Sequence, residues 1–279
     1  HGYDTVDYYH IERRLGNNER FKAFCRLCHE KGFVVVLDAV FNHTGRDFFA
    51  FKDIQQKGQS SCYKDWYANL DFSRRSEMGD CFDYEGWAGC KDLVKLNVDN
   101  GAVREYLFGA VKMWIEEFAI DGLRLDAADV LSKTFLDALA SFCRSIKSDF
   151  WLMGEVVHGD YSEWAQNGRL DSVTNYQMYK SLWSCLNDRN MYELSYNLDR
   201  EYNAESGMYK ESALYNFVDN HDVNRAVSVL DSPERHAHTN MPSVEGAKGT
   251  KPTLTFPGPE VPEGLQVQVL DAGDGQVVE

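Results

Sequence analysis

The residue pattern predicts an α/β fold with parallel strands. Three segments with a helical apolar period are each followed by a short apolar, β-branched or aromatic run. In addition, polar and ionisable residues cluster where these runs end. Alternation of helices and buried strands is typical of βα units whose strands lie parallel in one sheet.

The first helix–strand pair is predicted over residues 17–31 and 33–41. Phe21, Phe24, Cys25 and Cys28 share one helical face, Asn17 or Asn18 caps the start, and Gly32 follows the end. The run FVVVLDAVF at 33–41 is rich in β-branched residues and apolar apart from Asp38, as in a strand that is buried on both faces.

Two more pairs follow the same order. Apolar residues from Val103 to Phe118 predict a helix over 101–119, and GLRLD at 122–126 predicts a strand. A second apolar stripe, from Phe135 to Ile146, predicts a helix before the strand at 150–155. Shorter strands are predicted at 171–176 and 214–219.

Two segments interrupt this rhythm and define the expected domains. Residues 46–97 are aromatic and charged without a sustained period, which is typical of a small inserted subdomain. After residue 230 all six prolines fall between Pro233 and Pro262. We therefore expect a catalytic domain over 1–230, with 46–97 as the insert, and a Pro-rich linker with a short β-rich tail over 231–279. LQVQVL at 265–270 is the candidate tail strand, and the following DAGDG could turn it into a hairpin.

Composition narrows the class of function. The 279 residues carry 29 basic and 44 acidic side chains, a net charge of −15, which argues against nucleic acid or an anionic membrane as partner. Seven cysteines do not form a disulfide framework, so we expect free thiols and a cytoplasmic location. The sequence contains no run of 18 apolar residues, so no membrane span is predicted. The oligomeric state is not predicted by the sequence.

Four segments carry polar and ionisable residues at or just after predicted strand ends: DAVFNHTG (38–45), DGLRLDAADV (121–130), GEVVH (154–158) and FVDNHDVNR (217–225). Parallel barrels place their active sites at these carboxyl ends. Arg124 and Asp126 are two residues apart on a strand and so face the same way. We expect the guanidinium to lower the pKa of Asp126 and keep it ionised, whereas Glu155 holds its proton to higher pH.

Together the four segments resemble the conserved regions of the α-amylase family, glycoside hydrolase family 13, over residues 1 to about 230. The resemblance implies that Asp126 is the nucleophile, Glu155 the acid/base and Asp222 the carboxylate that stabilises the transition state. It also implies sugar contacts or supporting roles for a further set of residues. This set comprises Tyr3 as the stacking tyrosine, Asp38 as a structural aspartate, Arg124 as the partner of the nucleophile, and His43 and His221 as sugar ligands.

The family resemblance implies a (β/α)8 TIM barrel in which strands three to seven are identifiable, with the small domain inserted after strand three. Strands one, two and eight are not identified, so we expect a partial barrel from a longer or truncated protein. The implied substrates are α-glucan oligosaccharides, and no cofactor is required. Calcium is bound at the position of Asn42 in some family members; otherwise Asn42 would fix its loop by a hydrogen bond. Within the family, the resemblance is to members that act on maltooligosaccharides or cyclodextrins. It rests on the residues at four positions, namely Asp129, Val156, Val157 and His158.

Within the insert, Trp66, Tyr67, Tyr84 and Trp87 either stack on sugars or form the insert's own core. The activity that we expect is hydrolysis of α-1,4-glucosidic bonds through a covalent glycosyl–Asp126 intermediate. Two alternatives stay open, namely transglycosylation of the same substrates and an inactive fragment of such an enzyme. A metal-dependent hydrolase is disfavoured, since His29 with Glu30, or His43 with Asp47, matches no known ligand spacing.

Overall fold

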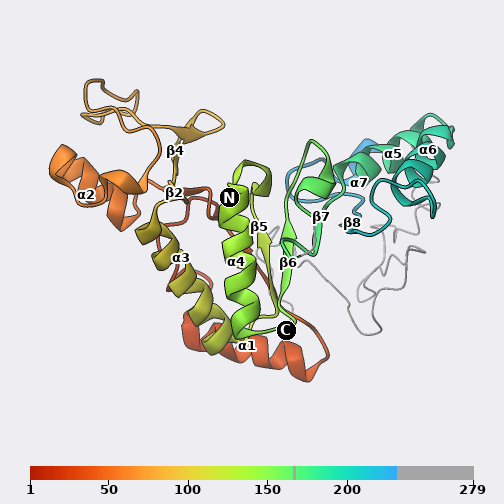
Figure 1. Cartoon of the computed structure of the whole chain (residues 1–279), viewed down its shortest axis with the longest axis horizontal. Helices are drawn as coiled ribbons and strands as arrows, with labels where there is room; N and C mark the ends of the chain where they lie inside the picture. The colour runs from red at the N-terminus through yellow and green to blue at the C-terminus, as the bar shows by residue number, and fades with distance from the viewer. Residues whose placement is uncertain (166–167, 231–279) are drawn as a thin grey trace. The chain divides into compact units, whose positions relative to one another are not determined.

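The structure, a computed structural model, describes residues 1–165 and 168–230 (Figure 1). These residues form two compact units. Unit 1 comprises His1–Glu155 and Trp164–Asp171, and unit 2 comprises Val156–Glu163 and the described residues from Ser172 on. The linker and tail expected over 231–279 lie outside the described residues.

Unit 1 is built on three parallel strands with helices between them. Strand β1 pairs with β5, and β5 with β6, so that Asp38 lies beside Arg124 and Arg124 beside Met153. Its elements, in chain order, are α1 (Asn18–Glu30), β1 (Val36–Ala39), β2 (His43–Gly45), α2 (Phe49–Lys57), the 3-10 turns Gly58–Ser60 and Lys64–Trp66, β3 (Gly86–Trp87), β4 (Cys90–Lys95), α3 (Gly101–Met113), a π-helical turn (Trp114–Phe118), β5 (Gly122–Leu125), a 3-10 turn (Ala128–Val130), α4 (Lys133–Ile146) and β6 (Trp151–Gly154).

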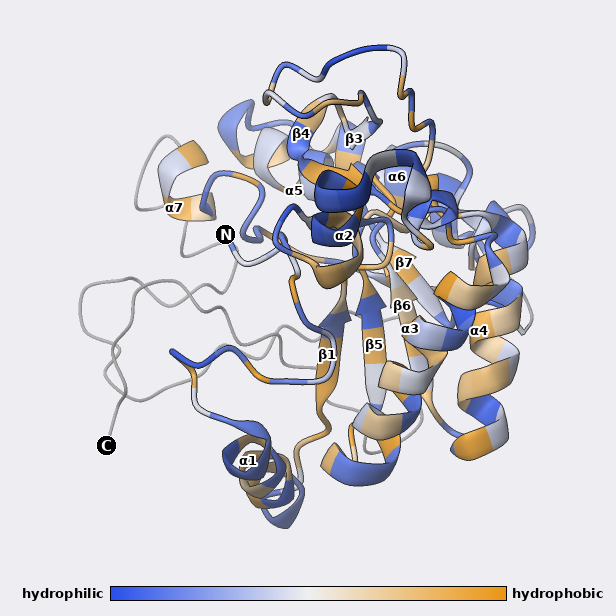
Figure 2. Cartoon of the chain, turned by 90° about the vertical axis from the view of Figure 1, so that its left-hand side faces the viewer, coloured by the Kyte–Doolittle hydropathy of each residue, from blue (hydrophilic) through white to orange (hydrophobic). Residues whose placement is uncertain are grey.

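The helix–strand pairs of unit 1 confirm the predicted order with shorter strands. The strand predicted over 33–41 is β1, which spans four residues, and the helix predicted over 101–119 is α3 continued by the π-helical turn. Figure 2 shows α3 and α4 beside β5 and β6. Phe108 of α3 stacks on Phe142 of α4 with ring centroids 4.9 Å apart, and Leu123 and Leu125 of β5 are fully buried.

Close backbone approach explains one residue of β5. A Cβ atom on Gly122 would lie 2.5 Å from the carbonyl oxygen of Trp151 on the neighbouring strand. Only glycine therefore lets β5 and β6 pair at this position.

The inserted segment forms a small sheet together with β2, the three residues that precede it. Strands β2, β4 and β3 form an antiparallel sheet in that order, joined by α2 and irregular loops. In Figure 1 this segment, in orange, lies at the end of unit 1 opposite α1. Tyr67 and Tyr84 are buried in it, with Tyr67 packing on Phe51.

Unit 2 pairs two parallel strands and packs two helices together. Its elements are a 3-10 turn (Tyr161–Glu163), β7 (Ser172–Thr174), α5 (Tyr176–Asn187), α6 (Tyr192–Tyr202), β8 (Ala213–Tyr215) and α7 (Ala226–Val229). The strands expected at 171–176 and 214–219 correspond to β7 and β8. Helices α5 and α6 were not predicted. In the part of the chain that the structure describes, no helix is long and apolar enough to cross a bilayer.

Candidate active site

Strand β5 places two functional side chains side by side. Arg124 and Asp126 are two residues apart, as expected, and the Arg124 Nη1 atom donates to Asp126 Oδ1 at 3.2 Å. The backbone N–H of Asp126 donates to the Ala39 carbonyl oxygen at 3.1 Å, which fixes the end of β5 against β1. Because the leucines between and before them are buried, both polar side chains project from the opposite face of the strand.

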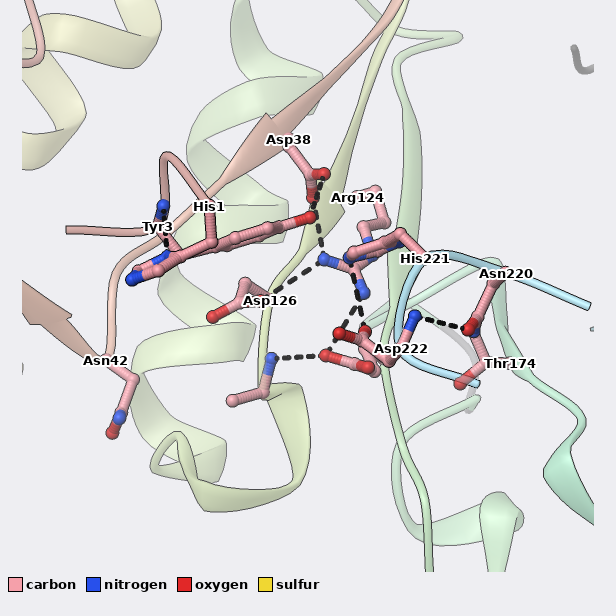
Figure 3. Close-up of polar contacts among 12 residues, drawn as sticks. His1, Tyr3, Asp38, Asn42, Arg124, Asp126, Thr174, Asn220, His221 and Asp222 are labelled. Atoms are coloured by element: carbon pink, nitrogen blue, oxygen red, sulfur yellow. Dashed lines mark hydrogen bonds and ion pairs between the residues drawn. The ribbon is translucent and has the colours of Figure 1, made fainter. Parts of the chain in front are cut away.

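The Arg124 guanidinium joins three carboxylates from three neighbouring strands (Figure 3). Nη1 also donates to Asp38 Oδ1 at 2.9 Å, and Nη2 forms an ion pair with Glu155 Oε2 at 3.1 Å. The Arg124 side chain is only 12% exposed. One cation therefore orients Asp38, Asp126 and Glu155 toward a common centre, with planar donors suited to carboxylates.

Glu155 is held at the end of β6 by the backbone as well. The Ala127 N–H donates to Glu155 Oε2 at 3.1 Å, and the Ala128 N–H donates to the Glu155 carbonyl oxygen at 2.9 Å. Ala127 reaches this position with φ of 46°, in the left-handed region that is rare for residues other than glycine. This backbone contact was not predicted, because side-chain spacing carries no signal for it.

Burial reverses the expected pKa shift of Asp126. The pKa of Asp126 is raised to about 7, mainly by desolvation and also by the neighbouring carboxylates of Glu155 and Asp38, against the lowering effect of Arg124. The expectation that Arg124 keeps this pKa low was therefore wrong in the net result. The guanidinium acts in the expected direction but is shared among three carboxylates.

Tyr3 and Asp38 lie at the edge of this cluster. The Tyr3 hydroxyl donates to Asp38 Oδ2 at 2.9 Å, and the Arg124 guanidinium lies 6.0 Å from the centre of the Tyr3 ring. Burial, together with Asp38, raises the pKa of the phenol, so Tyr3 stays protonated and donates. Asp38 lies within β1, opposite Arg124 in the β1–β5 register, and accepts hydrogen bonds from both Tyr3 and Arg124.

His43 lies next to this cluster and holds the Tyr3 segment. Its Nε2 lies 3.0 Å from the Tyr3 carbonyl oxygen and its Nδ1 3.2 Å from Asn42 Nδ2. Burial lowers the pKa of His43, so the neutral ring donates from Nε2 and accepts at Nδ1. The side chain is 1% exposed and lies 5.8 Å from the Trp87 ring. Contact between His43 and a sugar stays a prediction.

Asn42 has the hydrogen-bonding role that was the alternative to calcium binding. It is buried, and its amide nitrogen donates to His43. Among residues 1–165 and 168–230, no group of three or more His, Cys, Asp or Glu side chains is arranged to hold a metal ion. A calcium site at Asn42 stays a prediction.

His221 and Asp222 belong to unit 2. They are adjacent, with His221 Nε2 at 3.2 Å from Asp222 Oδ2, and the Asp222 N–H donates to Asn220 Oδ1 at 2.9 Å (Figure 3). The structure thus brings together Tyr3, Asp38, His43, Arg124, Asp126 and Glu155 in unit 1. The roles of His221 and Asp222 stay predictions.

The aromatic residues of the insert divide between the two expectations. Tyr67 and Tyr84 are 3% and 2% exposed and belong to the insert's core. Trp66 packs in a ring cluster with Phe49 and Tyr106. Trp87 is 37% exposed, and sugar stacking at this ring stays a prediction.

Comparison with known proteins identifies the class to which this fold and site belong. Residues 1–260 match the family described as Alpha amylase, catalytic domain. The chain is 36% identical over 231 residues to neopullulanase 2 of Thermoactinomyces vulgaris, covering 81% of this chain and 38% of that protein. It is 33% identical over 237 residues to a cyclomaltodextrinase of Geobacillus thermopakistaniensis (strain MAS1), covering 84% and 40%.

A solved cyclomaltodextrinase structure superimposes with a TM-score of 0.75 at 32% identity, covering 83% of this chain and 40% of that one. The fold and site thus define the class of protein: an enzyme of the TIM-barrel type, with carboxylate side chains at the ends of its parallel strands. The chain belongs to the α-amylase family, glycoside hydrolase family 13, which confirms the family predicted from the four segments. It spans about 40% of the length of the curated relatives that it matches.

Proposed function

We propose that the protein hydrolyses α-1,4-glucosidic bonds in maltooligosaccharides and related α-glucans with retention of configuration. The observation that carries the proposal is that Asp126 and Glu155, at the ends of adjacent strands, both bind one guanidinium. Retaining glycosidases use two carboxyl groups about 5–5.5 Å apart, and neighbouring parallel strands suit that separation. The names of the relatives, cyclomaltodextrinase and neopullulanase, support this substrate class.

In the proposed reaction Asp126 attacks the anomeric carbon while Glu155 protonates the departing glycosidic oxygen. A glycosyl ester on Asp126 forms, and Glu155 then takes a proton from water, which attacks the same carbon and releases Asp126. Three carboxylates share one cation, so the cluster favours keeping one proton near neutral pH. The reaction requires Asp126 as the ionised carboxylate and Glu155 as the proton donor.

The remaining predicted residues would bind the substrate and stabilise the transition state. Tyr3 would present its ring to the sugar, and His43, His221 and Asp222 would bind its hydroxyl groups. No cofactor enters this proposed chemistry, and no nucleic acid or membrane is an expected partner. The seven cysteines are free thiols, which supports the proposed cytoplasmic location.

The test is the product spectrum of maltotriose together with the variant Asp126→Asn. We expect the wild type to release the α-anomer of the new reducing end first, as measured by proton NMR. Asp126→Asn should lower kcat by at least about 10⁴-fold while circular dichroism stays unchanged. A β-anomer as first product, or wild-type turnover by the variant, would remove Asp126 from the nucleophile role.

Two other outcomes distinguish the alternatives. Oligosaccharides longer than maltotriose in early samples would show transglycosylation, in which a sugar hydroxyl replaces water. A cooperatively folded wild-type chain without turnover of maltotriose or an aryl maltoside would favour the inactive fragment.

A further inference from the structure

Helix α6 carries a buried carboxyl group that the proposed reaction does not use. Glu201 is fully buried, and its Oε2 accepts from Asn175 Nδ2 at 2.7 Å. Within residues 1–165 and 168–230, its Oε1 has no hydrogen-bond partner. Burial raises the pKa of Glu201 against the opposing effects of Asn175 and Arg200. A buried carboxyl group is costly unless its hydrogen bonds are satisfied, so a task for this residue is expected.

The partner of Glu201 joins three elements of unit 2. Asn175 follows β7 and is fully buried. Its Oδ1 accepts from the Met178 N–H at 3.0 Å and caps α5, and its own N–H donates to the Tyr215 carbonyl oxygen at the end of β8. Its Nδ2 also donates to Asn216 Oδ1 at 2.9 Å. Glu201 therefore orients an amide that links β7, β8 and the start of α5.

The segment that begins at Asn216 carries His221 and Asp222 and is attached to α5. The Phe217 ring stacks on Tyr179, with ring centroids 5.2 Å apart. Asn220 Nδ2 donates to the Tyr176 hydroxyl at 3.0 Å, and Asn220 Oδ1 in turn accepts from the Asp222 N–H. Every described contact in this path lies within unit 2 and leads from α6 to the segment 216–222.

We propose that Glu201 is a positioning residue for His221 and Asp222: by holding the Asn175 amide, it fixes the start of α5 and of the segment 216–222. This inference rests on the proposed function, because it gives His221 and Asp222 their task on the sugar. Glu201 touches neither substrate nor reacting atoms and acts through Asn175.

Amide hydrogen exchange of the full chain tests the positioning directly. Glu201→Ala should speed exchange in residues 216–224 by at least about tenfold, since the segment loses its anchor. Glu201→Gln should restore slow exchange, because the glutamine amide oxygen accepts from Asn175 Nδ2. Glu193→Gln is the matched control: this residue lies on the same helix, pairs with surface Lys180 and should leave 216–224 unchanged.

Residues 133–146 of α4 serve as an internal reference in the same samples. Exchange at 216–224 that stays at the wild-type rate in Glu201→Ala overturns the proposal. So does a rise that is equal at 133–146, which would reflect global destabilisation, or a failure of Glu201→Gln to restore slow exchange.

Kinetics on maltotriose supply a readout that a merely structural role would not move. With active sites titrated, Glu201→Ala should lower kcat at least about tenfold with a smaller change in KM, and Glu201→Gln should stay within about twofold of wild type. Faster exchange with unchanged kcat would overturn the catalytic part of the inference. If the wild type hydrolyses no α-glucan, the proposed function fails, whereas hydrogen exchange still decides whether Glu201 positions the segment.

Discussion

At Arg124, one guanidinium lies within 3.2 Å of three carboxylate groups, and this ratio of charges governs the protonation of the site. A single neighbouring cation would keep a carboxylate ionised. At Asp126, burial and the two other carboxylates outweigh that attraction. The nucleophile proposed for this site therefore gains its charge only as the pH approaches neutrality.

This leads to a prediction for the pH dependence of hydrolysis. Because Asp126 has a pKa of about 7, kcat/KM should fall as the pH drops below that value, approaching a tenfold loss per pH unit. The pKa that the pH profile gives belongs to the coupled cluster of carboxylates around Arg124. Initial rates on maltotriose at low substrate concentration, from pH 4 to 9, provide the measurement.

The matched variant is Asp38→Asn, which removes one of the carboxylates that raise the pKa of Asp126. Its acid limb should move to lower pH. An acid limb at the wild-type position in this variant would contradict an electrostatic effect of Asp38 on Asp126.

For single residues, the sequence predicted which way a side chain points but not how its surroundings change its pKa. The two-residue spacing of Arg124 and Asp126 correctly predicted a shared strand face. It carried no measure of how deeply Asp126 is buried, and for that reason the predicted sign of its pKa shift was wrong. The hydrogen bond from the Ala127 backbone N–H to Glu155 could not be predicted either, because any residue type other than proline supplies that donor.

At the scale of elements, prediction succeeded where a large apolar stripe meets the core. Helix α4 buries Phe135, Leu136, Leu139 and Cys143 on one face, which is the signal that located it. Helices α5 and α6 were missed for the opposite reason. The buried residues of α5 include Ser181 and Ser184, and those of α6 are Asn197 and Glu201, so polar residues occupy much of the buried face of each helix.

Leu139 leads to a prediction for the packing of α4. The side chain is fully buried, so Leu139→Ala should lower the free energy of unfolding by about 2–5 kcal/mol through lost contacts and a cavity. Urea unfolding followed by tryptophan fluorescence measures the change. Ser141→Ala, at an exposed position of the same helix, is the control and should change stability by less than about 0.5 kcal/mol. Equal effects of the two substitutions would mean that α4 does not pack as described.

For the whole molecule, family and fold class followed from the order of segments along the chain, and the match over residues 1–260 confirms both. Periodicity and strand-end chemistry depend on local sequence, so they survive in a chain that spans about 40% of its relatives. Quantities that sum over many groups behave differently. The pH dependence of stability is one, since it depends on every carboxylate whose environment changes on folding.

Asp126 makes a separable contribution to that dependence. Its pKa is raised from 3.8 to about 7 on folding, so its contribution to stability is fully present below pH 4 and is lost as the pH rises through 7. The shift corresponds to a change on the order of 4 kcal/mol. Asp126→Asn cannot ionise, so its free energy of unfolding minus that of the wild type should grow by this amount between pH 4 and pH 8. Urea unfolding of both proteins across that range measures the difference, in which the pH effects of groups outside the Arg124 cluster cancel. A difference that stays constant with pH would show that Asp126 ionises as easily in the folded chain as in the unfolded one, and that the guanidinium of Arg124 offsets its burial.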